Sequence, residues 1–274
     1  MQEKTWILNQ QDNQQIYFYE SGESTGFGDN NTIYVESGKS TLDMSTKNIL
    51  AFDFALQNLE FDYLFRTTTT SYVNLKILNS FIEENLNESE FVYSGKLMST
   101  KGSSEDEVIF VSGAGIIFNR NTVQKIVDNK SKVNLELWDD VGIGKILNAF
   151  NVEPLEGRMN VVEGNIFNQQ IDLTHYHYRC RIDNHFGYPR FLEVYVIKYL
   201  HKYINGVQIN RLTSFIFSVI FEIGKLFYIQ YPFLKLLNLI KLISKVILPK
   251  YMFRIIKKNF STFYKKIQLK YFKY

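Results

Sequence analysis

Charge is divided so unevenly along this chain that the sequence predicts two physically different pieces. Residues 211–274 contain 13 Lys and Arg and one acid, Glu222. Residues 1–210 contain 18 basic and 27 acidic residues. The formal net charge of +3 is therefore the sum over an acidic body and a strongly basic end. This pattern indicates an anionic partner for the basic end. We predict two domains, residues 1–205 and residues 206–274.

The basic end is also apolar. Residues 212–221 and 226–234 are uncharged, but neither run reaches the ~18 residues that a membrane-spanning helix needs. In residues 233–248 the polar side chains recur every three or four positions, and residues 250–274 have a similar composition. This pattern predicts basic amphipathic helices that bind an anionic membrane surface through residues 211–274. Packing on the body or on another subunit is the alternative, and the acidic body argues against nucleic acid as a partner.

The single cysteine, Cys180, excludes an intrachain disulfide and a cysteine-based zinc site, and we expect it to be buried. The first residues, Met1 to Trp6, contain no apolar run of the kind found in signal peptides. We therefore expect a reducing compartment, with a cytoplasmic protein that is peripheral at the membrane surface.

Residues 1–205 alternate between short aromatic or β-branched runs and segments with helical spacing of apolar residues. Strands are predicted at residues 16–19, 32–35, 62–66, 91–97 and 108–111, with a loop at 22–28 and a polar turn at 67–71. Helices are predicted at residues 46–59, 75–86, 121–127 and 139–150, with Asn121 as an N-cap. The alternation predicts an α/β layer architecture.

Four segments of the body carry residue types that serve binding or catalysis. They are Phe61–Asn74 with its Thr-rich turn, Phe110–Arg120 with Ser-Gly-Ala-Gly, Trp138–Gly144 with two adjacent acids, and the basic run His175–Arg181. Each has a plainer interpretation: a surface loop, a tight turn, a solvated helix start and a surface strand. Paired carboxylates, a Gly-rich segment and a basic cluster that meet at strand ends would nevertheless form a ligand site.

Taken in order, these segments resemble the Fringe-like β-1,3-glycosyltransferases, a GT-A group. In that group a strand with Arg leads into an Asp-Asp-Asp turn and Thr-Tyr-Val-Asn. A Gly-Gly-Ala-Gly segment follows, and then two acids, Val and a Gly three residues on. The matching residues here are Arg66 to Asn74, Ser112-Gly113-Ala114-Gly115, and Asp139-Asp140-Val141 with Gly144. Lys47 resembles the Lys of the group's preceding helix, and Lys4-Thr5-Trp6 resembles its Thr-Trp, so the resemblance covers residues 4–205.

The resemblance implies an α/β fold of the GT-A type, a Rossmann-like nucleotide-sugar-binding fold. The group's first strand precedes its Thr-Trp, so this N-terminal strand is expected either to be missing here or to lie upstream of Met1. The implied activity is that of an inverting glycosyltransferase, a hexosyltransferase. It would move a sugar from a nucleotide-sugar, a UDP-sugar in this group, to a surface glycan or a lipid-linked acceptor. The alternatives are a non-catalytic pseudo-glycosyltransferase and a structural protein whose tail assembles oligomers.

The resemblance also assigns roles to residues. It makes Asp140 the catalytic base, with Asp139 as the fallback or as a group that orients the acceptor. We expect acceptor contacts from Gly113, Ala114, Gly115 and Trp138. We expect donor contacts from Lys47, Arg66, Thr68, Thr69, Thr70, His175, His177, Arg179 and Arg181.

The turn that carries metal-binding aspartates in the group is Thr68-Thr69-Thr70 here. Thr hydroxyls are poor ligands for Mn²⁺ or Mg²⁺, so we expect no metal to be required. Alternate positions on a strand point to one face, which would place His175, His177, Arg179 and Arg181 together. We expect this basic set to hold the donor diphosphate in place of a metal.

Overall fold

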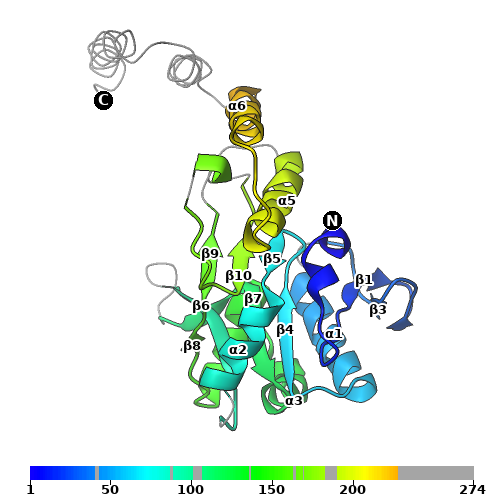
Figure 1. The fold of residues 1–274 in the computed structure, drawn as a ribbon. Coiled ribbons are helices and arrows are strands. Elements are labelled where there is room, and N and C mark those ends of the chain that lie inside the picture. Colours follow the sequence, from blue (N-terminus) through cyan, green and yellow to red (C-terminus); the bar gives the residue numbers. More distant parts are fainter. Residues whose placement is uncertain are drawn as a thin grey trace, which may run out of the picture. The chain divides into compact units, whose positions relative to one another are not determined.

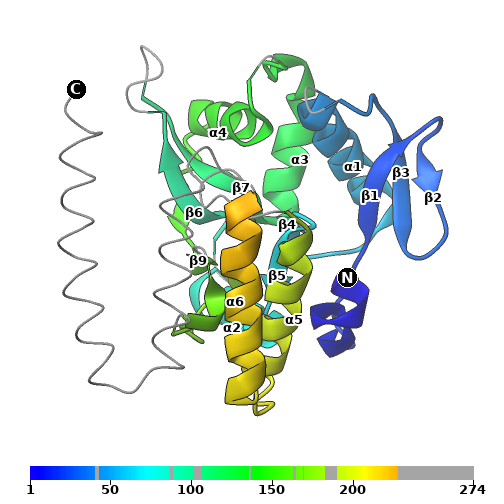
Figure 2. The same cartoon turned by 90° about the horizontal axis from the view of Figure 1, so that it is seen from above.

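The structure, a computed structural model, describes residues 1–40, 43–86, 89–100, 107–135, 137–162, 165–168, 170–182 and 190–227. The chain forms two compact units (Figures 1 and 2). The first comprises residues 1–161, 171–181 and 197–205, and the second comprises residues 162–170, 182–196 and 206–274. The predicted mixed α/β class is confirmed: the described residues form three sheets, each with parallel and antiparallel pairs, and helices lie between their strands in the sequence. Within the described residues, no helix is both long enough and apolar enough to cross a membrane.

The largest sheet of the first unit has the strand order β4-β7-β6-β8. Its strands are β4 (Tyr63–Thr67), β6 (Tyr93–Ser99), β7 (Ile109–Asn119) and β8 (Leu155–Glu156). The central strand β7 is antiparallel to both β4 and β6, and it places Gly115 opposite Thr67. This pairing brings the end of β4 beside the Ser-Gly-Ala-Gly segment.

Two smaller sheets of three strands flank the site. One has the order β1-β3-β2 and contains β1 (Phe18–Gly22), β2 (Gly26–Phe27) and β3 (Thr32–Glu36). The other has the order β5-β10-β9 and contains β5 (Ser71–Val73), β9 (Met159–Val161) and β10 (His177–Arg179). The second sheet pairs Arg179 with Ser71, so it joins the basic run to the end of the Thr-rich turn.

The described residues form six α-helices: α1 (Met44–Asn58), α2 (Leu75–Asn85), α3 (Arg120–Asp128), α4 (Asp139–Ala149), α5 (Glu193–Ile204) and α6 (Arg211–Phe227). Helix α4 packs on β7, and α1 packs on α3, on α4 and on β3. Within the part of the chain that the structure describes there are also five short 3₁₀ helices: η1 (Gln2–Lys4), η2 (Trp6–Asn9), η4 (Lys130–Lys132), η5 (Ile166–Asn168) and η6 (Arg190–Leu192).

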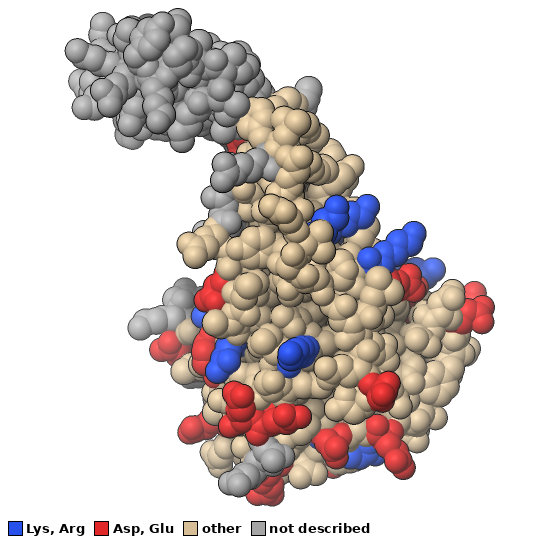
Figure 3. Space-filling model, in the orientation of Figure 1, with Lys and Arg blue, Asp and Glu red and all other residues tan. Residues whose placement is uncertain are grey.

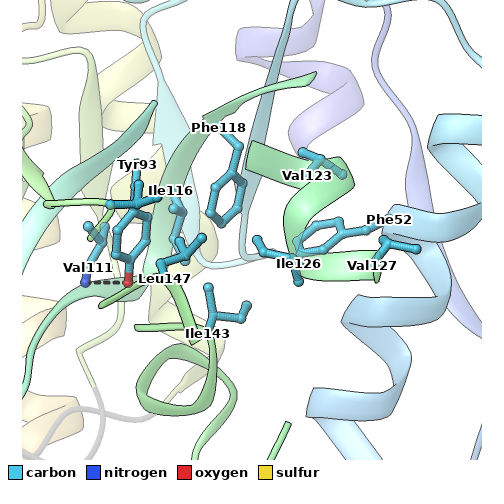
Figure 4. Close-up of a cluster of buried hydrophobic side chains, with 11 residues drawn as sticks. Phe52, Tyr93, Val111, Ile116, Phe118, Val123, Ile126, Val127, Ile143 and Leu147 are labelled. Atoms are coloured by element: carbon cyan, nitrogen blue, oxygen red, sulfur yellow. Dashed lines mark hydrogen bonds between the residues drawn. The ribbon is translucent and has the colours of Figure 1, made fainter. Parts of the chain in front are cut away.

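The main core of the first unit lies between β7 and the helices α1, α3 and α4 (Figure 4). Phe118 stacks on Tyr93 and meets Phe52 edge-on, with ring centroids 5.8 and 5.5 Å apart. The hydroxyl of Tyr93 is buried, and it accepts a hydrogen bond of 2.8 Å from the Val111 backbone N–H. Each fully buried large apolar side chain contributes about 1.5–3 kcal/mol, so this cluster fixes α4 against the sheet.

Several predicted strands have different bounds. The strand predicted at residues 16–19 is β1 at Phe18–Gly22, and it is half-buried because it forms an edge of its sheet. The predicted loop at residues 22–28 contains β2. The strand predicted to end at residue 111 continues to Asn119, so Ser-Gly-Ala-Gly lies inside β7. The predicted polar turn at residues 67–71 is shorter, because β5 begins at Ser71.

The predicted helices agree with α1, α2, α3 and α4 to within two residues at each end. The cap of α3 is Asn119 rather than Asn121, because the Asn119 carboxamide accepts hydrogen bonds from the backbone and the hydroxyl of Thr122. Cys180 is fully buried, as predicted. The amphipathic helices predicted at residues 233–248 and 250–274 lie outside the described residues.

The described part of the second unit is built around η5 and α6. Phe167 of η5 stacks on Phe217 and meets Phe221 edge-on, with ring centroids 5.4 and 5.2 Å apart. The domain boundary predicted at residues 205/206 coincides with one border between the units. Residues 162–170 and 182–196, which the sequence assigns to the first domain, belong to the second unit.

Candidate active site

Two adjacent carboxylates open helix α4 and face the backbone of β7. Asp139 and Asp140 form the first turn of the helix, where the helix dipole favours negative charge. Asp140 Oδ2 accepts a hydrogen bond of 2.8 Å from the backbone N–H of Gly113. The sequence segments around Arg66, Gly113 and Asp139 therefore meet in the first unit, as predicted for a ligand site.

Arg66 is buried beneath these carboxylates, with 7% of its side chain exposed. Its Nη2 donates to Asp139 Oδ2 at 2.8 Å, its Nε donates to the Tyr19 hydroxyl at 3.1 Å, and its Nη1 donates to the carbonyl of Gly113. These hydrogen bonds argue against the predicted role of Arg66 in donor binding. Its guanidinium is committed to protein groups, and it holds Asp139 and β7 in place.

Tyr19 and Asn48 complete the hydrogen bonds around Asp139, and sequence analysis missed both. The Tyr19 hydroxyl donates to Asn48 Oδ1 at 2.7 Å, and Asn48 Nδ2 donates to Asp139 Oδ2 at 2.7 Å. With the two bonds from Arg66, these contacts form a closed ring that ties β1, α1, β4 and α4 together. Asn48 precedes the buried apolar residues Ala51 and Phe52 by three and four positions, and this helical spacing was a usable signal. Tyr19 carries no such signal.

Asp140 has a different environment from Asp139. Its two oxygens accept hydrogen bonds from the backbone N–H groups of Gly113 and Val141, at 2.8 and 3.0 Å. Among the described residues, no cation forms an ion pair with it. Burial raises the pKa of the Asp140 carboxyl, and the charge of Asp139 adds to the rise, although the Gly113 and Val141 bonds and Arg66 oppose it. A raised carboxylate pKa is the property that a proton acceptor in catalysis requires.

Trp138 precedes this pair, and 75% of its surface is exposed. An exposed indole beside a carboxylate pair can stack on the apolar face of a ligand ring. Lys47 lies on α1, directly before Asn48, and is half-buried. These two predicted residues therefore lie on elements that contribute to the carboxylate cluster.

The Thr-rich turn is held within the protein. The hydroxyl of Thr68 lies 3.1 Å from that of Thr70 and 3.2 Å from that of Ser71. The carbonyls of Thr69, Thr70 and Ser71 accept hydrogen bonds from Gln2 Nε2, the Cys180 N–H and Trp6 Nε1, respectively. Hydroxyls that bond one another do not fit Mn²⁺ or Mg²⁺, which prefer carboxylate oxygens. Among the described residues, no group of three or more His, Cys, Asp or Glu could hold a metal ion.

The basic run reaches this turn, but its members are not equivalent. Strand β10 spans only His177–Arg179, so the shared strand face applies to His177 and Arg179. His175 lies beyond it, with its Nδ1 3.4 Å from Asp172 Oδ2. Arg181 follows the strand and is exposed, whereas Arg179 is half-buried.

His177 is fully buried, which argues against its predicted role as a diphosphate-binding cation. Its Nε2 lies 2.8 Å from the Ser71 hydroxyl and 3.4 Å from the Thr67 hydroxyl. Burial lowers the pKa of His177 to about 3, with a smaller contribution from the charge of Arg179. The imidazole is therefore neutral at physiological pH, and it links the Thr-rich turn to β4.

This burial predicts a pH dependence of stability. Between pH 6.5 and about 3 the unfolded chain binds a proton at His177 that the folded chain does not, so the free energy of unfolding falls as the pH falls. From pH 7 to pH 5, His177 should contribute about 2 kcal/mol to this fall. Urea unfolding of the wild type and of His177→Gln at both pH values measures the contribution. An equal fall in the two proteins would contradict the neutral buried imidazole.

The glycines of β7 make room for protein side chains, which argues against their predicted contact with an acceptor. A Cβ on Gly113 would lie 2.9 Å from Arg66 Nη1 and 3.2 Å from Asp140 Oδ2. A Cβ on Gly115 would lie 2.4 Å from both Nδ1 and Cε1 of His177. Ala114 is buried, and its carbonyl accepts a hydrogen bond from the Thr67 hydroxyl. Trp138 differs from these three residues, because its side chain is exposed.

We expect Gly115→Ala to lower the free energy of unfolding by about 1–3 kcal/mol, because the added methyl group overpacks a closed site. Gly26→Ala is the matched control, since no atom lies within 4 Å of the Cβ position at Gly26 in β2. It should be neutral or slightly stabilising. Chemical denaturation compares the two variants, and equal stabilities would contradict the tight contact with His177.

The arrangement as a whole combines a carboxylate with a raised pKa, an ion-paired partner carboxylate, an exposed indole and a basic run beside a Thr-rich turn. Such a set can accept a proton from a ligand hydroxyl and can bind an anionic group. Comparison with known proteins finds no family model and no curated protein that matches this chain.

Proposed function

We propose that the protein is an inverting glycosyltransferase of the GT-A type with Asp140 as its catalytic base. The observation that carries the proposal is that the two adjacent carboxylates at the start of α4 have different environments. Asp139 is ion-paired with Arg66, whereas Asp140 has backbone N–H partners and a raised pKa. Paired carboxylates in different environments support a division of roles between a base and a fixed charge.

In the proposed reaction, the hydroxyl oxygen of the acceptor attacks the anomeric carbon of a nucleotide-sugar. Asp140 takes the proton of that hydroxyl as the new C–O bond forms. The bond between the anomeric carbon and the diphosphate oxygen breaks, and the nucleoside diphosphate leaves with the electron pair. This single displacement inverts the anomeric configuration. Trp138 would stack on the acceptor ring beside Asp140.

Cationic side chains would stabilise the negative charge that develops on the leaving diphosphate. Arg179 pairs across the strands with Ser71, and the Cys180 N–H donates to Thr70, so the basic run adjoins the Thr-rich turn. Arg179, Arg181 and His175 are the candidates, because His177 is neutral and Arg66 is committed to Asp139. Arg–phosphate contacts are charge-assisted and frequently bidentate, and they need no metal.

Nucleotide-sugar binding tests the proposal. A thermal-shift panel compares UDP-, GDP- and CMP-sugars, each with EDTA and with Mn²⁺. A donor at ~100 times its Kd adds about 2.7 kcal/mol of stability, so one nucleotide class should raise the Tm in EDTA. Arg181→Gln should weaken this effect, whereas Lys76→Gln, a change at an exposed residue of α2, should leave it unchanged. Binding that EDTA abolishes would overturn the metal-free site, and no shift with any donor would overturn donor binding.

A non-catalytic pseudo-glycosyltransferase is the second candidate. The observation in its favour is the engagement of the Thr-rich turn by Gln2, Trp6 and Cys180, where the resembling group has metal-binding carboxylates. This candidate predicts that no nucleoside diphosphate is released from any nucleotide-sugar. Product release in the presence of acceptor glycans therefore separates the two.

A further inference from the structure

Helix α6 has one face that packs within its own unit. Ser218 and Phe221 are buried there, and Phe217 and Phe221 contact the ring of Phe167. Asn165 Nδ2 donates to the carbonyl and hydroxyl of Ser218 at 3.1 and 2.9 Å, and it lies 3.5 Å from Glu222 Oε1. The only acid of residues 211–274, Glu222, is thus directed toward this packed face.

The other face of α6 carries an exposed aliphatic stripe. Its members recur every three or four positions, which keeps them within about 80° around the helix axis. The stripe consists of Leu212 (63% exposed), Ile216 (48%), Ile220 (42%) and Ile223 (37%). Four large aliphatic side chains in one row on a solvent-exposed helix indicate an interaction surface. Figure 2 shows α6 as a continuous helix.

The sequence that follows α6 indicates the chemistry of the partner. Residues 228–274 contain 11 Lys and Arg and no Asp or Glu. An anionic surface with an apolar layer beneath it complements both the positive charge and the aliphatic stripe. Each basic residue near an anionic bilayer strengthens binding, and an exposed apolar helix face can enter the boundary between headgroups and acyl chains. The acidic side chains spread over the first unit (Figure 3) would not favour contact with such a surface.

We propose that the stripe Leu212, Ile216, Ile220 and Ile223 inserts into the headgroup region of an anionic phospholipid bilayer. Helix α6 then lies in the plane of the membrane surface, and the basic residues 228–274 contribute electrostatic attraction. This role does not depend on the proposed glycosyl transfer, and its test contains no nucleotide-sugar.

Vesicle co-sedimentation of the full chain tests the proposal. Vesicles of phosphatidylcholine alone are compared with vesicles that also contain phosphatidylglycerol. The wild type should bind the anionic vesicles at least tenfold more strongly than the neutral ones. The double variant Ile216→Glu/Ile220→Glu should lose at least tenfold in binding to anionic vesicles. The matched control, Leu8→Glu/Leu173→Glu, changes two exposed aliphatic residues of the first unit and should bind as the wild type does.

Three results would overturn the proposal. They are equal binding of the wild type to neutral and anionic vesicles, undiminished binding of the stripe variant, and an equal loss in the control. Circular dichroism and the Tm establish that each variant is folded. If Glu substitution unfolds the unit, Ile216→Ser/Ile220→Ser replaces it, with the same expected direction. A lipid-free dimer in sedimentation velocity that the stripe variant dissociates would assign the stripe to a second copy of the chain instead.

Discussion

Replacing Arg66 with Met should lower the free energy of unfolding by about 3–5 kcal/mol, because removal of one partner strands a buried charge. Asp139 would lose its ion pair of 2.8 Å and keep the hydrogen bond from Asn48. The Gly113 carbonyl would lose a partner at the same time, and so would the Tyr19 hydroxyl. Urea denaturation at pH 7 measures the loss.

Two further variants separate the buried pair from a general effect of charge. Arg181→Met removes an exposed arginine of the same unit and should change the stability by less than about 0.5 kcal/mol. Arg66→Met combined with Asp139→Leu removes both charges and should recover part of the loss, since the stranded carboxylate is gone. A stability of Arg66→Met within about 1 kcal/mol of the wild type would contradict the assigned role of Arg66.

Replacing Asp140 with Asn should lower kcat by about 10²–10⁴-fold, because the proton acceptor is lost. Donor affinity should stay unchanged, since the donor contacts are assigned to other residues. The stability should change by less than about 1 kcal/mol, because the loss of one accepted hydrogen bond is offset by removal of a partly desolvated charge. Kinetics under donor saturation and donor titration measure the two properties separately.

The raised pKa of Asp140 also fixes the sign of the pH dependence. The base acts as a carboxylate, so kcat/KM should fall as the pH falls through this pKa, which lies above the ordinary value of 3.8. Asp139→Asn serves as the comparison, and it should be destabilised because Arg66 loses a charged partner. Full activity in Asp140→Asn, together with inactive but stable Asp139→Asn, would move the base to Asp139.

The sequence predicted those helices and strands whose bounds depend on residues close together in the chain. Helices α1, α2 and α4 follow from apolar spacing, and α2 has the Asn74 carboxamide as its cap, which accepts from the Ile77 N–H. The predicted length of β7 was wrong, because Gly113 and Gly115 suggest a turn when they are considered without the rest of the fold. In the fold they lie inside a strand between β4 and β6, where side chains from other segments fill the Cβ positions.

The short strands β5, β9 and β10 have no such local signal. They are defined by pairing with other segments: Ser71 of β5 pairs with Arg179 of β10, 108 positions away, and Met159 of β9 pairs with His177 of β10, 18 positions away. Their formation therefore depends on the rest of the fold being in place. This long-range dependence also explains why the extent of β10 was overestimated.

For the candidate site, the sequence singled out Arg66, Asp139 and Asp140, but it did not reveal that Arg66 bonds protein groups. Whether a charged side chain faces a ligand or a buried partner depends on distant residues. Here the hydrogen-bond network around Arg66 comes from residues elsewhere in the chain. They are Tyr19, Asn48 and Asp139, which lie 47, 18 and 73 positions from Arg66. The same holds for His177, whose charge is set by burial. The chemistry of the residues was readable from the sequence, but their solvation was not.

The most direct measurement is the release of nucleoside diphosphate from UDP-, GDP- and CMP-sugars in EDTA, with and without acceptor glycans. We expect the wild type to release nucleoside diphosphate from one class of nucleotide-sugar, and an acceptor to stimulate this release. Asp140→Asn should lose it. An acceptor product with inverted anomeric configuration would accompany the release. No release above the enzyme-free rate from any donor, or undiminished release in Asp140→Asn, would contradict the proposed glycosyl transfer.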